Sequence, residues 1–177
     1  MRIHWNEYYE DKLIEAAKEM AVAARTAPKG RGRDQLHILI LTGQEKDAVA
    51  EKMREIGERE DIAFFRRDSE NLLTAPVLLL IGTETTPLEV PHCGYCGLAD
   101  CAENREAGTI PCAFSSGDLG IAFGSAVALA AHRHVDNRIM FTAGKASIEC
   151  GIFPSKVKMA HGILLSATGK NPFFDRK

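Results

Sequence analysis

Four of the five cysteines in this chain fall within twenty residues, and this cluster constrains the chain more than any other feature. They are Cys93, Cys96, Cys101 and Cys112, spaced C-x2-C-x4-C-x10-C. The opening residues, MRIHWNEYYEDK, contain neither the basic stretch nor the apolar stretch of an export signal. In a chain without such a signal, clustered cysteines favour metal ligation or redox chemistry over a disulfide framework. We therefore expect a cytoplasmic protein with a metal or redox site.

The spacing of the four cysteines suits an iron–sulfur cluster. Three close thiolates can cap one face of a compact [4Fe-4S] or [2Fe-2S] core, while the fourth thiolate returns after a short excursion of the chain. Gly94 and Gly97 flank the close pair of cysteines. Glycine removes Cβ bulk and permits positive φ, so backbone amides there can turn toward sulfur. We predict that Cys93, Cys96, Cys101 and Cys112 are the metal ligands.

A structural zinc site made of four thiolates is the main rival interpretation. Zinc sites usually pair one C-x2-C knuckle with a second of the same kind, and here only one half has that form. Metal-free thiols or a disulfide pair are further alternatives. His92 adjoins Cys93 and is either a ligand, a hydrogen-bond donor to one, or a solvated loop residue. Cys150 stands apart and is most simply a small buried hydrophobe.

The remaining chain alternates between helical and strand patterns. Apolar positions recur every three to four residues in 9–24 and 45–59, and the segment 119–131 is apolar nearly all round, so we predict three helices there. Ser115 and Asp118 resemble a capping box opening the last of them. Continuous apolar runs predict buried strands at 36–41, 77–81 and 162–166, and shorter strands are expected at 62–65 and 139–142.

These elements predict a single α/β domain covering residues 1–177. Residues 83–114 form a long cysteine-rich insert, which a bound metal would hold together. No run reaches the roughly 18 to 20 consecutive apolar residues that cross a bilayer, so we expect no membrane span.

Charge restricts the partners of the chain. Twenty-two Lys and Arg against twenty-four Asp and Glu leave a net charge of −2, so we expect neither nucleic-acid nor membrane binding. A local basic loop carries Arg25, Lys29, Arg31 and Arg33, which either bind an anionic cofactor group or are simply solvated. The loop lacks the P-loop pattern, and no Ser-His-Asp or paired-carboxylate signature indicates a hydrolase.

The residues also carry two family resemblances. CGYCGLADC, then AENREAG and a later cysteine, resembles the four-cysteine domain of electron-transport and corrinoid iron–sulfur proteins. Nearly the whole chain resembles a bacterial and archaeal ferredoxin-domain family of unknown function. The segments that carry this resemblance are AARTAPKGRGRD, TAPVLLLIG, the cysteine run, SSGDLGIAFGSAVALAAHRHVDNRIMFTAGKA and GILLSATGKNPFFDR. This resemblance implies a [4Fe-4S] cluster on the four cysteines and no known substrate.

The order of elements is similar to that of nitroreductase-like flavoproteins, with Ala27 and Pro28 matching their A-P loop. The Asn and Trp that follow A-P in those proteins are replaced by Gly32 and Leu36. The similarity implies an α+β sandwich with a central mixed sheet flanked by helices, a homodimer, and FMN bound near the basic loop. Two functions result: an iron–sulfur electron-transfer protein, with a flavin-linked oxidoreductase as one form of it, or a zinc-stabilised binding module without enzymatic activity.

Overall fold

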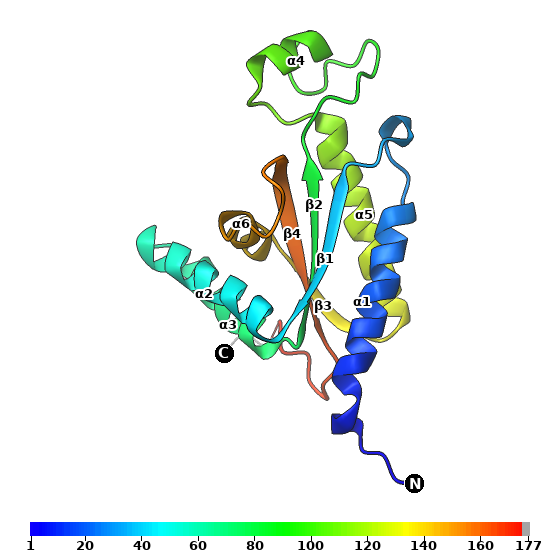
Figure 1. The fold of residues 1–177 in the computed structure, drawn as a ribbon, viewed down its shortest axis with the longest axis vertical. Coiled ribbons are helices and arrows are strands. Elements are labelled where there is room, and N and C mark those ends of the chain that lie inside the picture. The colour runs from blue at the N-terminus through cyan, green and yellow to red at the C-terminus, as the bar shows by residue number, and fades with distance from the viewer. Residues whose placement is uncertain (175–177) are drawn as a thin grey trace.

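The computed structural model describes residues 1–174 and has one four-stranded sheet between two helical layers (Figure 1). The strands are β1 (Leu36–Thr42), β2 (Val77–Glu84), β3 (Asp136–Met140) and β4 (Val157–Ser166), in the spatial order β1-β2-β4-β3. One face is covered by α1 (Tyr9–Thr26) and α5 (Ala113–His132), and the other by α2 (Gly43–Arg59), α3 (Ala63–Thr74) and α6 (Phe141–Glu149). The shorter elements are η1 (Trp5–Glu7), η2 (Gly30–Gly32) and α4 (Cys101–Ala107).

Burial on both faces explains why the central strands read as continuous apolar runs. On β2, Leu79 and Ile81 pack against α1 and α5, whereas Leu78 and Leu80 pack against the opposite layer, and all four are fully buried. The strands predicted at 36–41, 77–81 and 162–166 are therefore confirmed. The α+β architecture with flanking helices is confirmed as well.

Every strand pair in the described residues is antiparallel, so the expectation of a mixed sheet was wrong. A single helix between β1 and β2 would return the chain to the start of β1 and give a parallel pair. Two helices, α2 and α3, instead bring it back to the end where β1 stopped, so that Thr42 pairs with Val77 (Figure 1). The predicted strand at 62–65 is in fact the start of α3.

The strand predicted at 139–142 is only partly a strand. Residues 139–140 are the end of β3, which stops at Met140, and residues 141–142 begin α6 at Phe141. Gly144 allows α6 to lie directly on β4, since a Cβ atom there would come within 1.9 Å of the carbonyl oxygen of Ala160.

Helix α5 is long and apolar enough, by length and composition alone, to cross a membrane. It nevertheless packs against α1, and the hydroxyl of Ser125 donates to the carbonyl of Ala23 at 2.9 Å.

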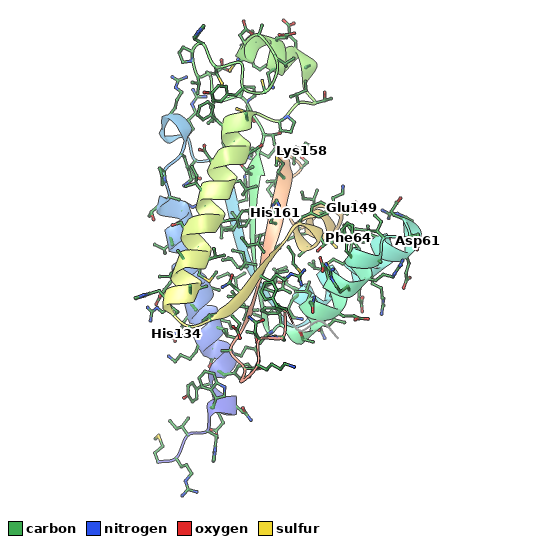
Figure 2. All side chains as sticks on the ribbon, turned by 180° about the vertical axis from the view of Figure 1, so that it is seen from behind. Asp61, Phe64, His134, Glu149, Lys158 and His161 are labelled. Carbon is green, nitrogen blue, oxygen red and sulfur yellow. The ribbon has the colours of Figure 1, made fainter. Side chains whose placement is uncertain are left out.

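Beyond the end of β3, the free part of β4 carries His161 between α5 and α6 (Figure 2). Its ring contacts those of Phe123 and Phe141, at centroid distances of 5.2 and 6.5 Å. Its Nδ1 atom is buried and has no hydrogen-bond partner among residues 1–174. Burial lowers the pKa of His161 below its ordinary value of 6.5.

Candidate metal centre

The cysteines lie in residues 85–112, which leave β2 beyond one end of the sheet and return to start α5 (Figure 1). Within this segment, the carboxylate of Asp100 caps α4 by accepting the backbone N–H groups of Ala102 and Glu103. Gly108 ends α4 in the left-handed conformation with φ of 66°. The segment therefore has its own short helix, which stands apart from the sandwich.

Cys112 is the most enclosed of the cluster cysteines, only 7% exposed, and it immediately precedes α5. Its backbone N–H donates to the carbonyl of Thr85 at 3.1 Å, which joins the two ends of the segment. Burial acts to raise the pKa of its thiol, whereas hydrogen bonding from the backbone of Ser115, Leu88 and Phe114 and from the Ser115 side chain acts to lower it. The net pKa is lowered, so the site favours the thiolate form that ligates metals.

Cys93 and Cys96 lie in the loop before α4 and Cys101 is the first residue of α4, and all three are half-buried. The backbone N–H of Tyr95 donates to the sulfur of Cys93 at 3.5 Å. Cys93 and Cys101 line one small cavity of about 240 Å³. Gly94 and Gly97 have φ of 64° and 87°, the left-handed backbone that the sequence analysis predicted for them.

All five cysteines are free thiols. In the part of the chain that the structure describes, no three His, Cys, Asp or Glu side chains converge closely enough to hold a metal ion. The donor set still fits an iron–sulfur cluster or zinc, because it consists of four thiols, one of which already accepts a backbone N–H, while another has a lowered pKa. Ligation by all four would therefore require the loop cysteines to close on the anchored Cys112.

The structure also gives the positions of two further residues from the sequence analysis. His92 is exposed, with φ of 53°. Cys150 is exposed rather than buried, so that prediction was wrong. The physical reason is that α6 ends at Glu149, and Cys150 follows it as the C-cap rather than lying on the packed face of the helix.

The basic loop between α1 and β1 uses its cations internally. Arg25 donates to the carboxylate of Asp34 at 2.6 Å and to the carbonyl of Leu36 at 3.0 Å. The ammonium of Lys29 donates to three carbonyls at the end of α1, those of Ala24, Arg25 and Ala27, at 3.3, 2.6 and 2.8 Å. Lys29 is therefore a cap for the C-terminus of α1.

Arg31 holds the cysteine segment to this loop. Its guanidinium donates to the carbonyls of Leu88 and Glu89 at 3.2 and 2.5 Å, whereas the Arg33 side chain is exposed. Three of the four cations predicted to bind a cofactor thus bind the protein itself. Sequence reasoning missed this role because a backbone carbonyl acceptor leaves no mark in the sequence.

Residues of α5 complete the support of the site. The predicted capping box is not formed, because α5 begins at Ala113, before Ser115. The Ser115 hydroxyl lies within hydrogen-bond distance of Gln35 Oε1, at 3.0 Å, and of the Thr86 carbonyl, at 3.2 Å. The carboxylate of Asp118 accepts the backbone N–H of Gly30. Both side chains therefore tie α5 to neighbouring loops.

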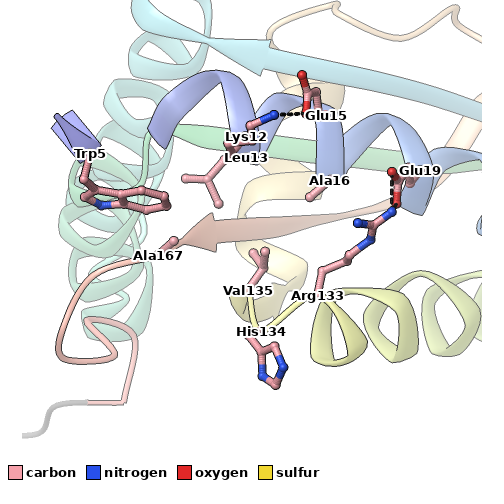
Figure 3. A pocket seen from close by; sticks show the side chains of 10 residues that line it. All are labelled: Trp5, Lys12, Leu13, Glu15, Ala16, Glu19, Arg133, His134, Val135 and Ala167. Atoms are coloured by element: carbon pink, nitrogen blue, oxygen red, sulfur yellow. Dashed lines mark hydrogen bonds and ion pairs between the residues drawn. The ribbon is translucent and has the colours of Figure 1, made fainter. Parts of the chain in front are cut away.

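A separate cavity of about 380 Å³ lies at the opposite end of the sheet (Figure 3). Trp5 and Leu13 are among its apolar walls. Its charged side chains form pairs, Lys12 with Glu15 at 2.8 Å and Arg133 with Glu19 at 2.5 Å. These paired charges leave the cysteine end of the molecule as the stronger functional candidate.

Comparison with solved structures defines the fold class. The chain is similar to a nitroreductase with bound FMN from Desulfitobacterium hafniense, with a TM-score of 0.62, 18% identity, and coverage of 88% of this chain and 78% of that one. It is also similar to the nitroreductase CinD of Lactococcus lactis in complex with nicotinic acid, with a TM-score of 0.60, 18% identity, and coverage of 94% and 84%. The chain therefore has a nitroreductase-like fold.

Sequence comparison gives the family. Residues 108–176 match the family described as uncharacterized protein containing a ferredoxin domain (DUF2148). The chain is also 37% identical, over 183 residues, to a protein of Archaeoglobus fulgidus, covering 99% of this chain and 98% of that protein. The chain belongs to this ferredoxin-domain family.

Proposed function

We propose that this protein is a redox protein that binds an iron–sulfur cluster, of the [4Fe-4S] type, through Cys93, Cys96, Cys101 and Cys112. The observation that carries the proposal is the environment of the Cys112 sulfur. It is buried, and hydrogen bonding from the backbone of Ser115, Leu88 and Phe114 lowers the pKa of its thiol despite that burial. Hydrogen bonds to ligand sulfur stabilise the thiolate and tune the reduction potential of a cluster.

The loop cysteines support the same proposal. The left-handed Gly94 and Gly97 free backbone amides to point at sulfur, and the sulfur of Cys93 already accepts one. Metal binding commonly orders the ligands that form its site, so cluster binding would bring the loop onto the fixed Cys112. The ferredoxin domain in the family description agrees with an electron-transfer role.

FMN is a second cofactor to be tested, because the D. hafniense nitroreductase was solved with FMN bound. A flavin-linked oxidoreductase would need a site for the FMN phosphate. Arg25, Lys29 and Arg31, however, donate to partners within this protein. The proposal therefore gives the cluster the primary role.

The test is an assay of iron, acid-labile sulfide, zinc and flavin on protein purified without oxygen. We expect brown protein with iron and sulfide. Each of Cys93→Ser, Cys96→Ser, Cys101→Ser and Cys112→Ser should lose most of the iron and the visible spectrum. Cys150→Ser is the matched control, because it removes an exposed thiol outside the segment and should keep both.

Other results of this assay would contradict the proposal. Colourless protein with stoichiometric zinc would favour a zinc-stabilised binding module. Yellow protein that releases flavin but holds no iron would favour a flavin enzyme. Iron that survives in all four cluster variants would mean that these cysteines are not its ligands.

A further inference from the structure

Arg105 is the only lysine or arginine among residues 85–112, the segment that carries the four cluster cysteines. The same segment contains four acidic residues, Glu89, Asp100, Glu103 and Glu106. Four ligating thiolates would add further negative charge to the segment. A single guanidinium therefore stands against all of this negative charge, and its position decides what it can do.

The fold places Arg105 beside two of the cysteines. Arg105 follows Cys101 by four residues in α4, and positions four apart lie on the same side of a helix. Arg105, Cys93 and Cys101 all line the cavity of about 240 Å³. Glu89 raises the pKa of Arg105 above its ordinary value, and the charge of Cys101 acts in the same direction. The guanidinium is therefore close enough to a predicted ligand to interact with its charge.

Glu89 holds the Arg105 guanidinium at this place. Its carboxylate accepts a hydrogen bond from Arg105 and forms an ion pair with it. The backbone carbonyl of Glu89 is bound in turn by Arg31 of the basic loop, at 2.5 Å. The ion pair as a whole is neutral, so removing only one of its members changes the charge next to the cysteines by one unit.

We propose that Arg105 is the cation that compensates the negative charge of the metal centre and thereby raises its reduction potential. This inference rests on the proposed function. A cluster held by four thiolates has a net negative charge that grows by one when the cluster accepts an electron, so a nearby positive charge favours the reduced state. The Arg105 side chain is 52% exposed, and water screens its charge, so we expect an effect of a few fold on the equilibrium constant for reduction.

The test is a potentiometric titration of the protein reconstituted with iron and sulfide, followed by its visible spectrum. Arg105→Gln removes the positive charge and leaves Glu89 uncompensated, so the reduction potential should fall. We expect the equilibrium constant for reduction to decrease about threefold or more, which is a shift of about 30 mV or more for one electron. Arg105→Lys retains the charge and should keep most of the potential of the unaltered protein.

Glu89→Gln separates this role from a structural one. Both Arg105→Gln and Glu89→Gln break the same ion pair, so a merely structural contact would shift the potential in the same direction in both variants. Charge compensation predicts opposite directions, because Glu89→Gln leaves the positive charge without its partner and should raise the potential. The double variant, which is neutral at both positions, should lie between the two single variants.

Arg54→Gln is the matched control. Arg54 is exposed on α2, which lies away from α4 (Figure 1), so this variant loses the same charge at a distance from the cysteines. Its potential should equal that of the unaltered protein. Raising the salt concentration from about 0.1 M to about 1 M should reduce the difference between Arg105→Gln and the unaltered protein, because salt screens exposed charges.

The iron content of each variant separates failure of this inference from failure of the proposed function. Full iron content with an unchanged potential in Arg105→Gln, or shifts of the same sign in Arg105→Gln and Glu89→Gln, would overturn the role of Arg105 alone. Loss of iron from Arg105→Gln that Arg105→Lys does not reverse would overturn it too.

Unaltered protein that takes up no iron would contradict the proposed function. In that case, titration of the reduced, metal-free protein with Co²⁺, followed by its visible spectrum, tests charge compensation alone. Four thiolates around a divalent ion are also net negative, so the Kd for Co²⁺ should rise about threefold or more in Arg105→Gln and stay unchanged in Arg54→Gln. Equal Kd values in these two variants would overturn the inference.

Discussion

Gly30 and Asp118, 88 residues apart in the chain, are joined by the backbone N–H of Gly30, which lies 3.0 and 2.9 Å from the two carboxylate oxygens. Asp118 is 8% exposed, so this contact compensates for the burial of a charged group. It fixes the basic loop to α5 beside the first turn after Cys112. The position of that loop therefore depends on a side chain that the sequence analysis assigned to a capping box.

Replacing this carboxylate should destabilise the fold. Asp118→Ala leaves the Gly30 N–H without its acceptor, and we expect the free energy of unfolding to fall by about 1–3 kcal/mol. Asp118→Asn keeps an oxygen acceptor and should lose less. Urea unfolding of the three proteins measures the difference, and an equal loss in both variants would mean that the hydrogen bond is not the source of the effect.

The bonds of Arg31 to the Leu88 and Glu89 carbonyls should hold the cysteine segment in place. Arg31→Ala removes both donors, so backbone amides of residues 88–111 should exchange hydrogen faster, while those of β2 and β4 keep their protection. Arg33→Ala is the control, because it removes the same charge from an exposed position in the same loop. Equal acceleration in both variants, measured by hydrogen-exchange mass spectrometry, would indicate a general charge effect instead.

The helices and strands that could be predicted from the sequence are those whose buried positions form a regular apolar pattern along the chain. β2 is apolar at every position from Val77 to Ile81 because helices cover both of its faces. Helix α3 was missed because two of its buried positions, Asp68 and Ser69, are polar and interrupt the apolar stripe. A short strand was expected at 62–65 in its place, and the expectation of a mixed sheet came separately, from the similarity to nitroreductase-like flavoproteins.

The candidate site was predictable only in its ligand types. Cysteine spacing is visible in one dimension, whereas the N–H groups around Cys112 come from Leu88 as well as from the start of α5. Leu88 and the start of α5 come together only because the chain returns from the cysteine segment to the end of β2, where the Cys112 N–H donates a hydrogen bond to the Thr85 carbonyl. Lys29 shows the same limit from the other side, because its charge suggested an anion ligand and nothing in the sequence indicates that its donors also cap α1.

The pKa values of the Cys112 and Cys150 thiols should differ from the ordinary value of 9.0 in opposite directions. Hydrogen bonds outweigh burial and lower the pKa of Cys112, whereas desolvation raises the pKa of Cys150. In reduced, metal-free protein, the midpoint of the pH dependence of alkylation should therefore be lower for Cys112. Peptide mass spectrometry after iodoacetamide treatment resolves the two sites.

Ser115→Ala tests the cause of this difference. It removes the Ser115 side chain that acts to lower the pKa of Cys112, so the alkylation midpoint of Cys112 should move to higher pH. The midpoint of Cys150 serves as an internal control and should not change. A Cys112 midpoint above that of Cys150 in the unaltered protein, or one that ignores the Ser115 substitution, would contradict the proposed environment of this sulfur.

His161 should make stability depend on pH, because burial between Phe123 and Phe141 lowers the pKa of its ring in the folded protein. Below about 6.5, the unfolded chain takes up a proton that the folded chain does not, so the free energy of unfolding falls as the pH decreases toward the lowered folded pKa. His161→Phe preserves a planar ring and removes the titration. The stability advantage of this variant over the unaltered protein should therefore grow between about pH 8 and about pH 5, as measured by urea unfolding. His132→Gln, at an exposed position, should not produce this growing advantage. Parallel pH profiles for His161→Phe and the unaltered protein would show that His161 is protonated equally in the folded and unfolded states.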